Sequence, residues 1–238
     1  MIEVDGLTVR FGGVLPIDGM TVTLPEGTCG LIGPNGAGKT TFFNVMSGFV
    51  KPVTGTVHAF GDNLLAMADF RRARWGLRRT FQTEQAIANL SVFDNVLLVH
   101  ENTGGGYSTR RQEVMDAITF VGLEEHTGDE VGTLGAGQRR LVEIARAVVG
   151  TPRVVLLDEP AAGLPDEETD HLAQVIRRIP DEVGALVVLV DHDMSLVSAC
   201  CETTAVLDFG RLIASGPTDE VLRDEHVIRA YLGTEEDV

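Results

Sequence analysis

The chain has 238 residues, 44% of them hydrophobic and 23% charged, which is the balance of a globular protein with a sizeable core. Its formal net charge of −16 repels a phosphate backbone, so we expect no nucleic-acid partner. The apolar runs are far shorter than the ~20 residues of a membrane span, and the N-terminus lacks a signal-peptide pattern, so any role at a membrane requires a partner.

The N-terminal residues predict two strands, then a buried strand and a helix. Residues 2–24 alternate between apolar and polar side chains and are interrupted at Gly12 and Gly13. A period of two predicts half-buried antiparallel strands. Residues 28–32 form an apolar run typical of a buried strand, and we expect a helix from Lys39 to Gly48.

The loop between this strand and this helix carries the phosphate-binding pattern G-x-x-x-x-G-K-[ST], known as a P-loop. Its glycines let consecutive backbone N–H groups face one anion, and the positive end of the following helix points at the same place. Lys39 supplies a positive charge for the β- and γ-phosphates, and the Thr40 hydroxyl is placed to ligate Mg²⁺. We expect a nucleoside triphosphate to contact Gly33, Pro34, Asn35, Gly36, Ala37, Gly38, Lys39, Thr40 and Thr41.

The next segment predicts a strand pair or edge strand over residues 52–60 and a helix over residues 64–75. Five arginines fall within residues 71–79 of this otherwise acidic chain. Two interpretations are open: a docking or membrane-proximal surface beside Gln82, or the solvated face of a helix.

From residue 84 to about residue 150 the pattern is helical. We expect a helix capped by Ser91 and running to His100, a glycine loop at 104–106, and helices over 108–121 and 137–149. The chain is therefore expected to form a single domain over residues 1–238. Residues 1–82 and 151–238 would form its α/β core, and residues 83–150 an inserted helical subdomain.

After residue 152, short apolar strands alternate with helices, which predicts a covered parallel sheet. Strands are expected at 154–157 and 185–190, with a helix over 166–179 between them. The tail predicts a hairpin over 203–214 and two short helices that end at Gly233.

The first of these strands ends in Asp158 and Glu159. Both carboxylates would reach the carboxyl edge of the sheet, where ligands of α/β proteins bind. Asp158 can hold Mg²⁺ directly or through water, because Mg²⁺ prefers oxygen ligands. Glu159, on the other face of the strand end, can accept a proton from the water that attacks the γ-phosphate.

The three cysteines, Cys29, Cys200 and Cys201, form no metal-binding spacing and no disulfide framework. We expect them to be small core or near-core residues of a reduced cytosolic protein.

The ordered set of motifs resembles the ATP-binding subunits of ABC transporters over essentially the whole chain. The residues that carry the resemblance are Gln82, the segments 134–138 and 156–160, and His192. The resemblance implies an α/β fold: a P-loop (RecA-like) core, an N-terminal antiparallel β-subdomain, and an inserted α-helical subdomain that carries the signature segment.

The resemblance also implies roles for single residues. Gln82 would sense Mg²⁺ and the attacking water, and His192 would contact the γ-phosphate, so that Glu159, His192 and Gln82 form the catalytic set. Thr40, Gln82 and Asp158 would hold Mg²⁺. Phe11 would stack on the adenine of ATP. The signature residues that contact nucleotide would be Gly135, Ala136, Gly137 and Gln138.

The family's arrangement is a head-to-tail dimer, in which each ATP lies between one chain's P-loop and the other chain's signature. Glycines at the start of the helix after Leu134 agree with this, because they predict a second amide-lined anion site. Two departures affect the expectation. Gly135 stands where the family commonly has Ser, so a hydroxyl donor to the γ-phosphate is missing. After the catalytic Glu, many members have an Asp directly after Ala-Leu. Here Pro165 follows Leu164 and Asp166 comes one place later, which affects communication between the two ATP sites.

Finer resemblance points to the ATPases of branched-chain amino acid importers, through segments 10–13, 79–83, 158–164, 192–194 and 227–233. It implies transmembrane permease subunits and a second ATPase chain as partners, a substrate-binding protein as an indirect partner, and a place at the cytoplasmic face of the membrane. The alternatives are the ATPase of a lipopolysaccharide exporter, a soluble ABC ATPase that is not a transporter subunit, and a non-hydrolysing regulatory cassette.

Overall fold

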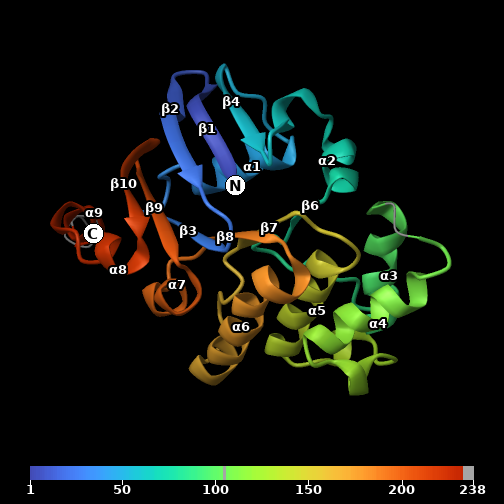
Figure 1. Cartoon of the computed structure of the whole chain (residues 1–238). Coiled ribbons are helices and arrows are strands. Elements are labelled where there is room, and N and C mark those ends of the chain that lie inside the picture. The colour runs from blue at the N-terminus through green and yellow to red at the C-terminus, as the bar shows by residue number, and fades with distance from the viewer. Residues whose placement is uncertain (104–105, 233–238) are drawn as a thin grey trace.

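The computed structural model describes residues 1–103 and 106–232, and a six-stranded sheet runs through its centre (Figure 1). The strand order is β10-β9-β3-β8-β7-β6, with parallel pairing except for the antiparallel edge strand β10. The strands are β3 (Thr28–Ile32), β6 (Leu77–Arg79), β7 (Val154–Asp158), β8 (Leu186–Val190), β9 (Thr203–Asp208) and β10 (Arg211–Pro217). Every residue of β3, β7 and β8 is buried, as expected for a sheet covered on both faces.

A second sheet of four antiparallel strands lies above one face of the first (Figure 1). Its order is β2-β1-β4-β5, from β1 (Ile2–Phe11), β2 (Val14–Leu24), β4 (Thr54–Ala59) and β5 (Asp62–Asn63). In β1 the side chains of Ile2, Val4, Leu7 and Val9 are buried while most of their neighbours face solvent.

The helices follow the strands in chain order. The α-helices are α1 (Lys39–Ser47), α2 (Asp69–Trp75), α3 (Val92–Thr103), α4 (Arg110–Phe120), α5 (Ala136–Val148), α6 (Asp166–Arg178), α7 (Met194–Cys200), α8 (Thr218–Val221) and α9 (Glu225–Leu232). Short 3₁₀ turns are η1 (Leu64–Ala66), η2 (Glu124–His126) and η3 (Val131–Thr133), and η4 (Ile179–Val183) is a π-helix. Within residues 1–103 and 106–232, none of the helices combines the length and apolarity required to cross a bilayer.

Alternate residues of the central strands face two separate hydrophobic cores. Leu156 and Val188 pack with the β1–β2 sheet and with Phe42 and Phe43 of α1. Their neighbours pack on the opposite face, where residues of helices α3 to α7 form the second core. The P-loop strand β3 is therefore held from both sides, which fixes the position of the loop that follows it.

Most of the predicted elements are confirmed. The N-terminal strands pair antiparallel, and α1 begins at Lys39 and ends at Gly48, whose left-handed φ of 88° closes the helix. Ser91 caps α3 by accepting the Asp94 N–H over 3.0 Å. The described part of residues 84–150 contains no strand, and its only β-pairing is an isolated bridge between Ser91 and Glu130. The subdomain limits at 83 and 150 stay a prediction, and most of the predicted 104–106 loop, with Gly233, lies outside the described residues.

The segment 64–79 differs from the prediction. A 3₁₀ turn and α2 replace the single predicted helix, and β6 is a strand that the sequence pattern did not predict. β6 pairs in parallel with β7 from Leu77 to Arg79 and extends the central sheet.

Both interpretations of the arginine cluster are wrong for three of its five members, because Arg72, Arg78 and Arg79 have buried side chains. Arg72 donates to the carbonyls of Val45 and Met46, the latter over 2.8 Å, at the C-terminal end of α1. Burial lowers the pKa of Arg72, and it lowers the pKa of Arg78 to about 10. Only Arg71 and Arg74 are exposed, so most of the cluster makes contacts inside the fold.

Candidate active site

The P-loop forms a pocket of about 250 Å³ beside the end of β7. Two of its glycines cannot be replaced without a clash. A Cβ at Gly33 would lie 2.1 Å from the Leu207 carbonyl oxygen, and one at Gly38 would lie 2.2 Å from the Pro16 carbonyl oxygen. The pocket is lined by Pro16, Asn35, Gly36, Ala37, Gly38, Lys39, Thr40, Thr41 and Glu159. The cradle therefore has the shape and the backbone donors that phosphates require.

Lys39 lies over this loop with its side chain largely buried. Its ammonium donates to the carbonyls of Gly33 and Pro34, the latter over 3.0 Å. Burial lowers the pKa of Lys39, while the nearby carboxylates of Glu159, Asp158 and Asp191 raise it. The ammonium is thus held at the pocket by carbonyls that an incoming phosphate can outcompete, because an ionised acceptor makes the stronger hydrogen bond.

Glu159 follows β7 in a strained backbone conformation, with a positive φ of 49°. Its N–H donates to the Val190 carbonyl over 2.7 Å, which ties the ends of β7 and β8 together. Such strain in a residue other than glycine is characteristic of functional sites. The Glu159 carboxylate accepts from the Gln82 side-chain amide over 2.8 Å, so two predicted catalytic residues meet directly.

Asp158, the predicted magnesium ligand, forms a buried ion pair with Arg79. Their side chains lie 2.7 Å apart, and each is 6% exposed. The Asp158 N–H donates to the Thr80 hydroxyl over 3.1 Å, and Arg79 also donates to Asn44 over 2.7 Å. Arg79 occupies one carboxylate oxygen and leaves the other for a metal ion or its water.

The donor set fits a small hard cation, because Thr40, Gln82 and Asp158 offer only oxygen ligands to it. No cluster of three His, Cys, Asp or Glu side chains suited to a metal occurs among the residues described. A magnesium site built here would therefore need phosphate oxygens or water to complete its coordination shell.

His192 follows β8 and is exposed, with 67% of its side chain accessible. The preceding Asp191 is 1% exposed and arranges the turn: its Oδ1 accepts the N–H of His192 over 2.8 Å and that of Asp193 over 3.0 Å. Burial raises the pKa of Asp191. His192 therefore projects from a turn that the buried Asp191 carboxylate holds in place.

The signature segment lies at the start of α5, away from the P-loop pocket. All residues from 134 to 138 are described, and none of them lines that pocket. Gly135 and Ala136 are exposed, whereas Gly137 packs so closely on Glu168 of α6 that a Cβ would lie 2.8 Å from its carboxylate. Phe11, at the end of β1, is 53% exposed and accessible to a ligand.

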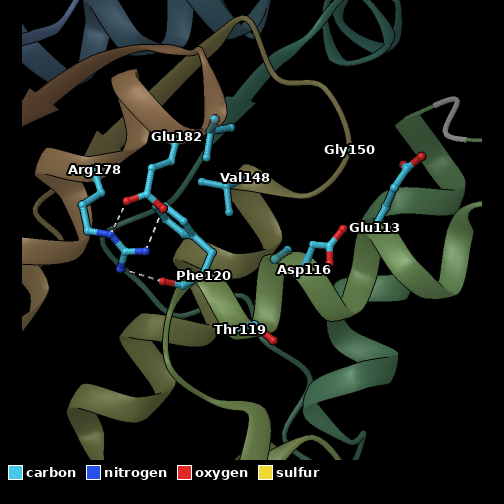
Figure 2. A pocket seen from close by; sticks show the side chains of 10 residues that line it. Glu113, Asp116, Thr119, Phe120, Val148, Gly150, Arg178 and Glu182 are labelled. Atoms are coloured by element: carbon cyan, nitrogen blue, oxygen red, sulfur yellow. Dashed lines mark hydrogen bonds and ion pairs between the residues drawn. The ribbon is translucent and has the colours of Figure 1, made fainter.

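A second cavity of about 450 Å³ lies between α4, α5 and α6 (Figure 2). Arg178 pairs there with both carboxylate oxygens of Glu182, at 2.7 and 2.8 Å, and donates to the Phe120 carbonyl over 3.1 Å. Glu182 raises the pKa of Arg178. The lining contains none of the predicted site residues, and the contact joins α6 to the end of α4.

The structure thus gathers the P-loop, Gln82, Asp158 and Glu159, and it leaves the signature apart. Pattern analysis overlooked Arg79, Thr80 and Asp191. Arg79 was hidden in an arginine-rich stretch, because it ends the three-residue strand β6, whose sequence Leu-Arg-Arg carries no strand pattern. Asp191 had a usable signal, since it ends a fully apolar strand directly before His192.

Comparison with known proteins gives two family matches. The family described as ABC transporter matches residues 17–162, and the family described as branched-chain amino acid ATP-binding cassette transporter matches residues 211–237. The high-affinity branched-chain amino acid transport ATP-binding protein BraF of Pseudomonas aeruginosa is 37% identical over 250 residues, covering 98% of each chain. The lipopolysaccharide export system ATP-binding protein LptB of Escherichia coli is 34% identical over 229 residues, covering 95% of each chain.

Solved structures share the fold. The ADP conformation of MJ1267, an ATP-binding cassette of an ABC transporter, superposes with a TM-score of 0.88 at 24% identity and covers 98% of both chains. The dimeric structure of MJ0796, a bacterial ABC transporter cassette, gives a TM-score of 0.80 at 23% identity, covering 92% of this chain and 99% of that one. The α/β architecture predicted from the motifs is confirmed.

Proposed function

The chain belongs to the ATP-binding subunits of ABC transporters, which hydrolyse ATP, and from this we propose that it powers the import of branched-chain amino acids or related small polar solutes. The observation that carries the hydrolytic part is the P-loop pocket with Glu159 in its wall and Gln82 bound to that carboxylate. The importer assignment is supported by the similarity to BraF and by the match of residues 211–237.

In the proposed reaction the P-loop amides and Lys39 bind the β- and γ-phosphates of ATP. Glu159 accepts the proton of the attacking water, and Gln82 and His192 orient the water and the γ-phosphate. Thr40, Asp158 and Gln82 would hold Mg²⁺, which when bound would offset phosphate charge. Phe11 stacks on the adenine, a contact worth ~1–3 kcal/mol.

We propose that each ATP is shared between two ATPase chains, identical or homologous. The P-loop pocket of one chain contains no signature residue, while Gly135 and Ala136 at the start of α5 are exposed. Head-to-tail pairing would place the N-terminal turn of α5, with its positive dipole end, against the γ-phosphate bound by the neighbour. ATP binding would then hold the pair together, and hydrolysis would release it.

The proposed contact with the permease is a groove of about 330 Å³ beside Gln82. Phe49 and Phe70 both line it and are 59% and 56% exposed, and apolar side chains gathered in one exposed patch mark an interaction site. Phe81, the residue before Gln82, also lines the groove and stacks on Phe49. A helix of a transmembrane subunit with apolar side chains would fit here and would place the chain at the cytoplasmic face of the membrane.

The similarity to LptB supports a second candidate, the ATPase of a lipopolysaccharide-type exporter. Purifying the tagged chain from membranes and identifying the co-purified subunits tests both candidates. An importer predicts a permease that works with a substrate-binding protein and takes up branched-chain amino acids in vesicles in the presence of ATP. Recovery of an export permease without such uptake would contradict the importer assignment.

A further inference from the structure

The start of α5 lacks the side-chain cap that most helices carry. Its N-cap residue is Gly135, in an extended conformation with φ −64° and ψ 164°, and glycine has no side-chain oxygen to accept an N–H of the first turn. Half of a capping box is nevertheless present, because the side-chain oxygen Oε1 of Gln138 accepts the Gly135 N–H over 3.0 Å. Gln138 therefore determines the shape of this turn.

Gln138 is itself held by a second hydrogen bond. Its side-chain nitrogen lies 2.9 Å from Nε2 of His126 in η2, and Nδ1 of His126 lies 2.8 Å from the Asp129 carboxylate. The result is a continuous series of hydrogen bonds from Asp129 through His126 and Gln138 to the backbone of Gly135. The residues come from two segments, the η2 turn with the loop after it and the first turn of α5.

The donor and acceptor roles in this series of hydrogen bonds are fixed by the chemistry of its members. Because the Gln138 oxygen accepts from Gly135, its NH₂ group must donate to His126. Nε2 of His126 must then be an unprotonated acceptor, and Nδ1 carries the proton that Asp129 accepts. His126 is thus required to be neutral and in the Nδ1–H tautomer.

We propose that His126 is a positioning residue for the nucleotide-contacting turn at residues 135–138, acting through Gln138. This inference deepens the proposed function, since it assumes that the turn contacts the ATP bound by a second chain. Without His126 the Gln138 amide can rotate away from Gly135, and the amides of Ala136 and Gly137 lose their fixed direction. Fixed direction is what lets a backbone donor stabilise transition-state charge.

Protonation of His126 reverses the contact with Gln138, because two N–H donors then face each other. The groups around the imidazole are Asp129 from its own segment and Glu167, Glu168 and His171 from α6, which line the same cavity of about 370 Å³. The donation from Gln138 to His126 therefore requires an unprotonated Nε2.

The tautomer is tested directly by the nitrogen NMR shifts of His126 in the full chain, with the resonances assigned by their loss in His126→Gln. The wild-type protein should show the Nδ1–H form, and Gln138→Ala should change the Nε2 shift, because that nitrogen loses the N–H that Gln138 donates to it. A wild-type His126 in the Nε2–H form would overturn the proposal, whatever the ATPase activity. This result is independent of whether two chains share ATP.

Activity supplies the second test. His126→Ala should lower ATP turnover about 10-fold or more, as misplacement of a binding group does. His126→Gln restores a side-chain acceptor for the Gln138 amide, so it should retain most of the turnover that His126→Ala loses. His171→Gln, in the same cavity, is the matched control and should behave as wild type. Equal turnover of wild type and His126→Ala, or equal loss in both His126 variants, would overturn the proposal.

Discussion

The Gln82 side-chain amide donates to the Glu159 carboxylate over 2.8 Å, so the segment after β6 and the end of β7 hold each other beside the P-loop. Arg140 of α5 also approaches this region, with the Gln82 and Ala162 carbonyls each 3.4 Å from its guanidinium. The proposed catalytic carboxylate is thus linked through Gln82 to the signature helix and, through Phe81, to the proposed permease groove.

Replacing Glu159 with Gln should leave ATP binding intact and abolish hydrolysis. The amide can still contact Gln82 but cannot accept a proton, and loss of general-base help costs roughly 10²–10⁴-fold in rate. Steady-state phosphate release and calorimetric ATP binding measure the two effects. Glu220→Gln, an exposed carboxylate of α8, is the control. Wild-type turnover in Glu159→Gln would remove Glu159 as the base.

Replacing Arg79 with Ala should destabilise the fold strongly. The substitution leaves the buried Asp158 carboxylate without its ion-pair partner, and breaking a buried pair in this way costs ~3–5 kcal/mol. Urea unfolding measures the change in the free energy of unfolding. Arg74→Ala, an exposed member of the same cluster, should change it little, and Arg79→Ala combined with Asp158→Asn should recover part of the loss. Equal stability of Arg79→Ala and Arg74→Ala would contradict the role assigned to the pair.

The sequence predicted those elements whose pattern lies within a few neighbouring residues. The P-loop and Glu159 follow short apolar strands and Asp158 ends one of them, while Ser91 and Gly48 mark helix ends by their chemistry. β6 escaped prediction because a strand of three residues has no measurable period and ends in two arginines. Nothing local indicates that Arg72, Arg78 and Arg79 are buried, since that depends on carbonyls and carboxylates brought in from α1, α2 and β7.

The site was predictable only as separate parts. The motif order places Gln82, Asp158 and Glu159 in one reaction, but the 2.8 Å contact between Gln82 and Glu159 depends on pairing of β6 with β7. The His126–Gln138 contact was likewise invisible, because a histidine and a glutamine twelve residues apart have no diagnostic spacing. Tertiary structure alone shows which polar groups satisfy one another.

Replacing Phe70 with Asp should weaken binding to the permease without affecting hydrolysis by the free chain. The substitution puts a charge beside the groove that holds Phe49 and Phe81, and burying an unpaired carboxylate against an apolar partner is unfavourable. The assay is co-purification of permease subunits with the tagged chain. Tyr107→Asp alters an aromatic that is 84% exposed and does not line the groove, so it should co-purify normally. Undiminished recovery with Phe70→Asp would exclude this groove as the docking site.

All three thiols should resist modification in the native protein. Burial raises the pKa of Cys29 and Cys201 and raises that of Cys200 to about 12, so almost no thiolate exists near pH 8. A colorimetric disulfide reagent should titrate the cysteines only after urea unfolding, when the thiol pKa values return to those of exposed cysteines. Rapid reaction of one thiol in the folded chain would show that its surroundings open.

Sharing of ATP between two chains is tested most directly by mixing two inactive variants. Lys39→Ala disables the P-loop. Gly135→Asp places a carboxylate against the incoming phosphate at a position with room for a Cβ and with a backbone that Asp tolerates as an N-cap. Each variant alone should be inactive. Their mixture should regain turnover, because one of the two sites in the mixed dimer combines an intact P-loop with an intact signature. A mixture as inactive as its parents, or full turnover by Gly135→Asp alone, would contradict the shared site.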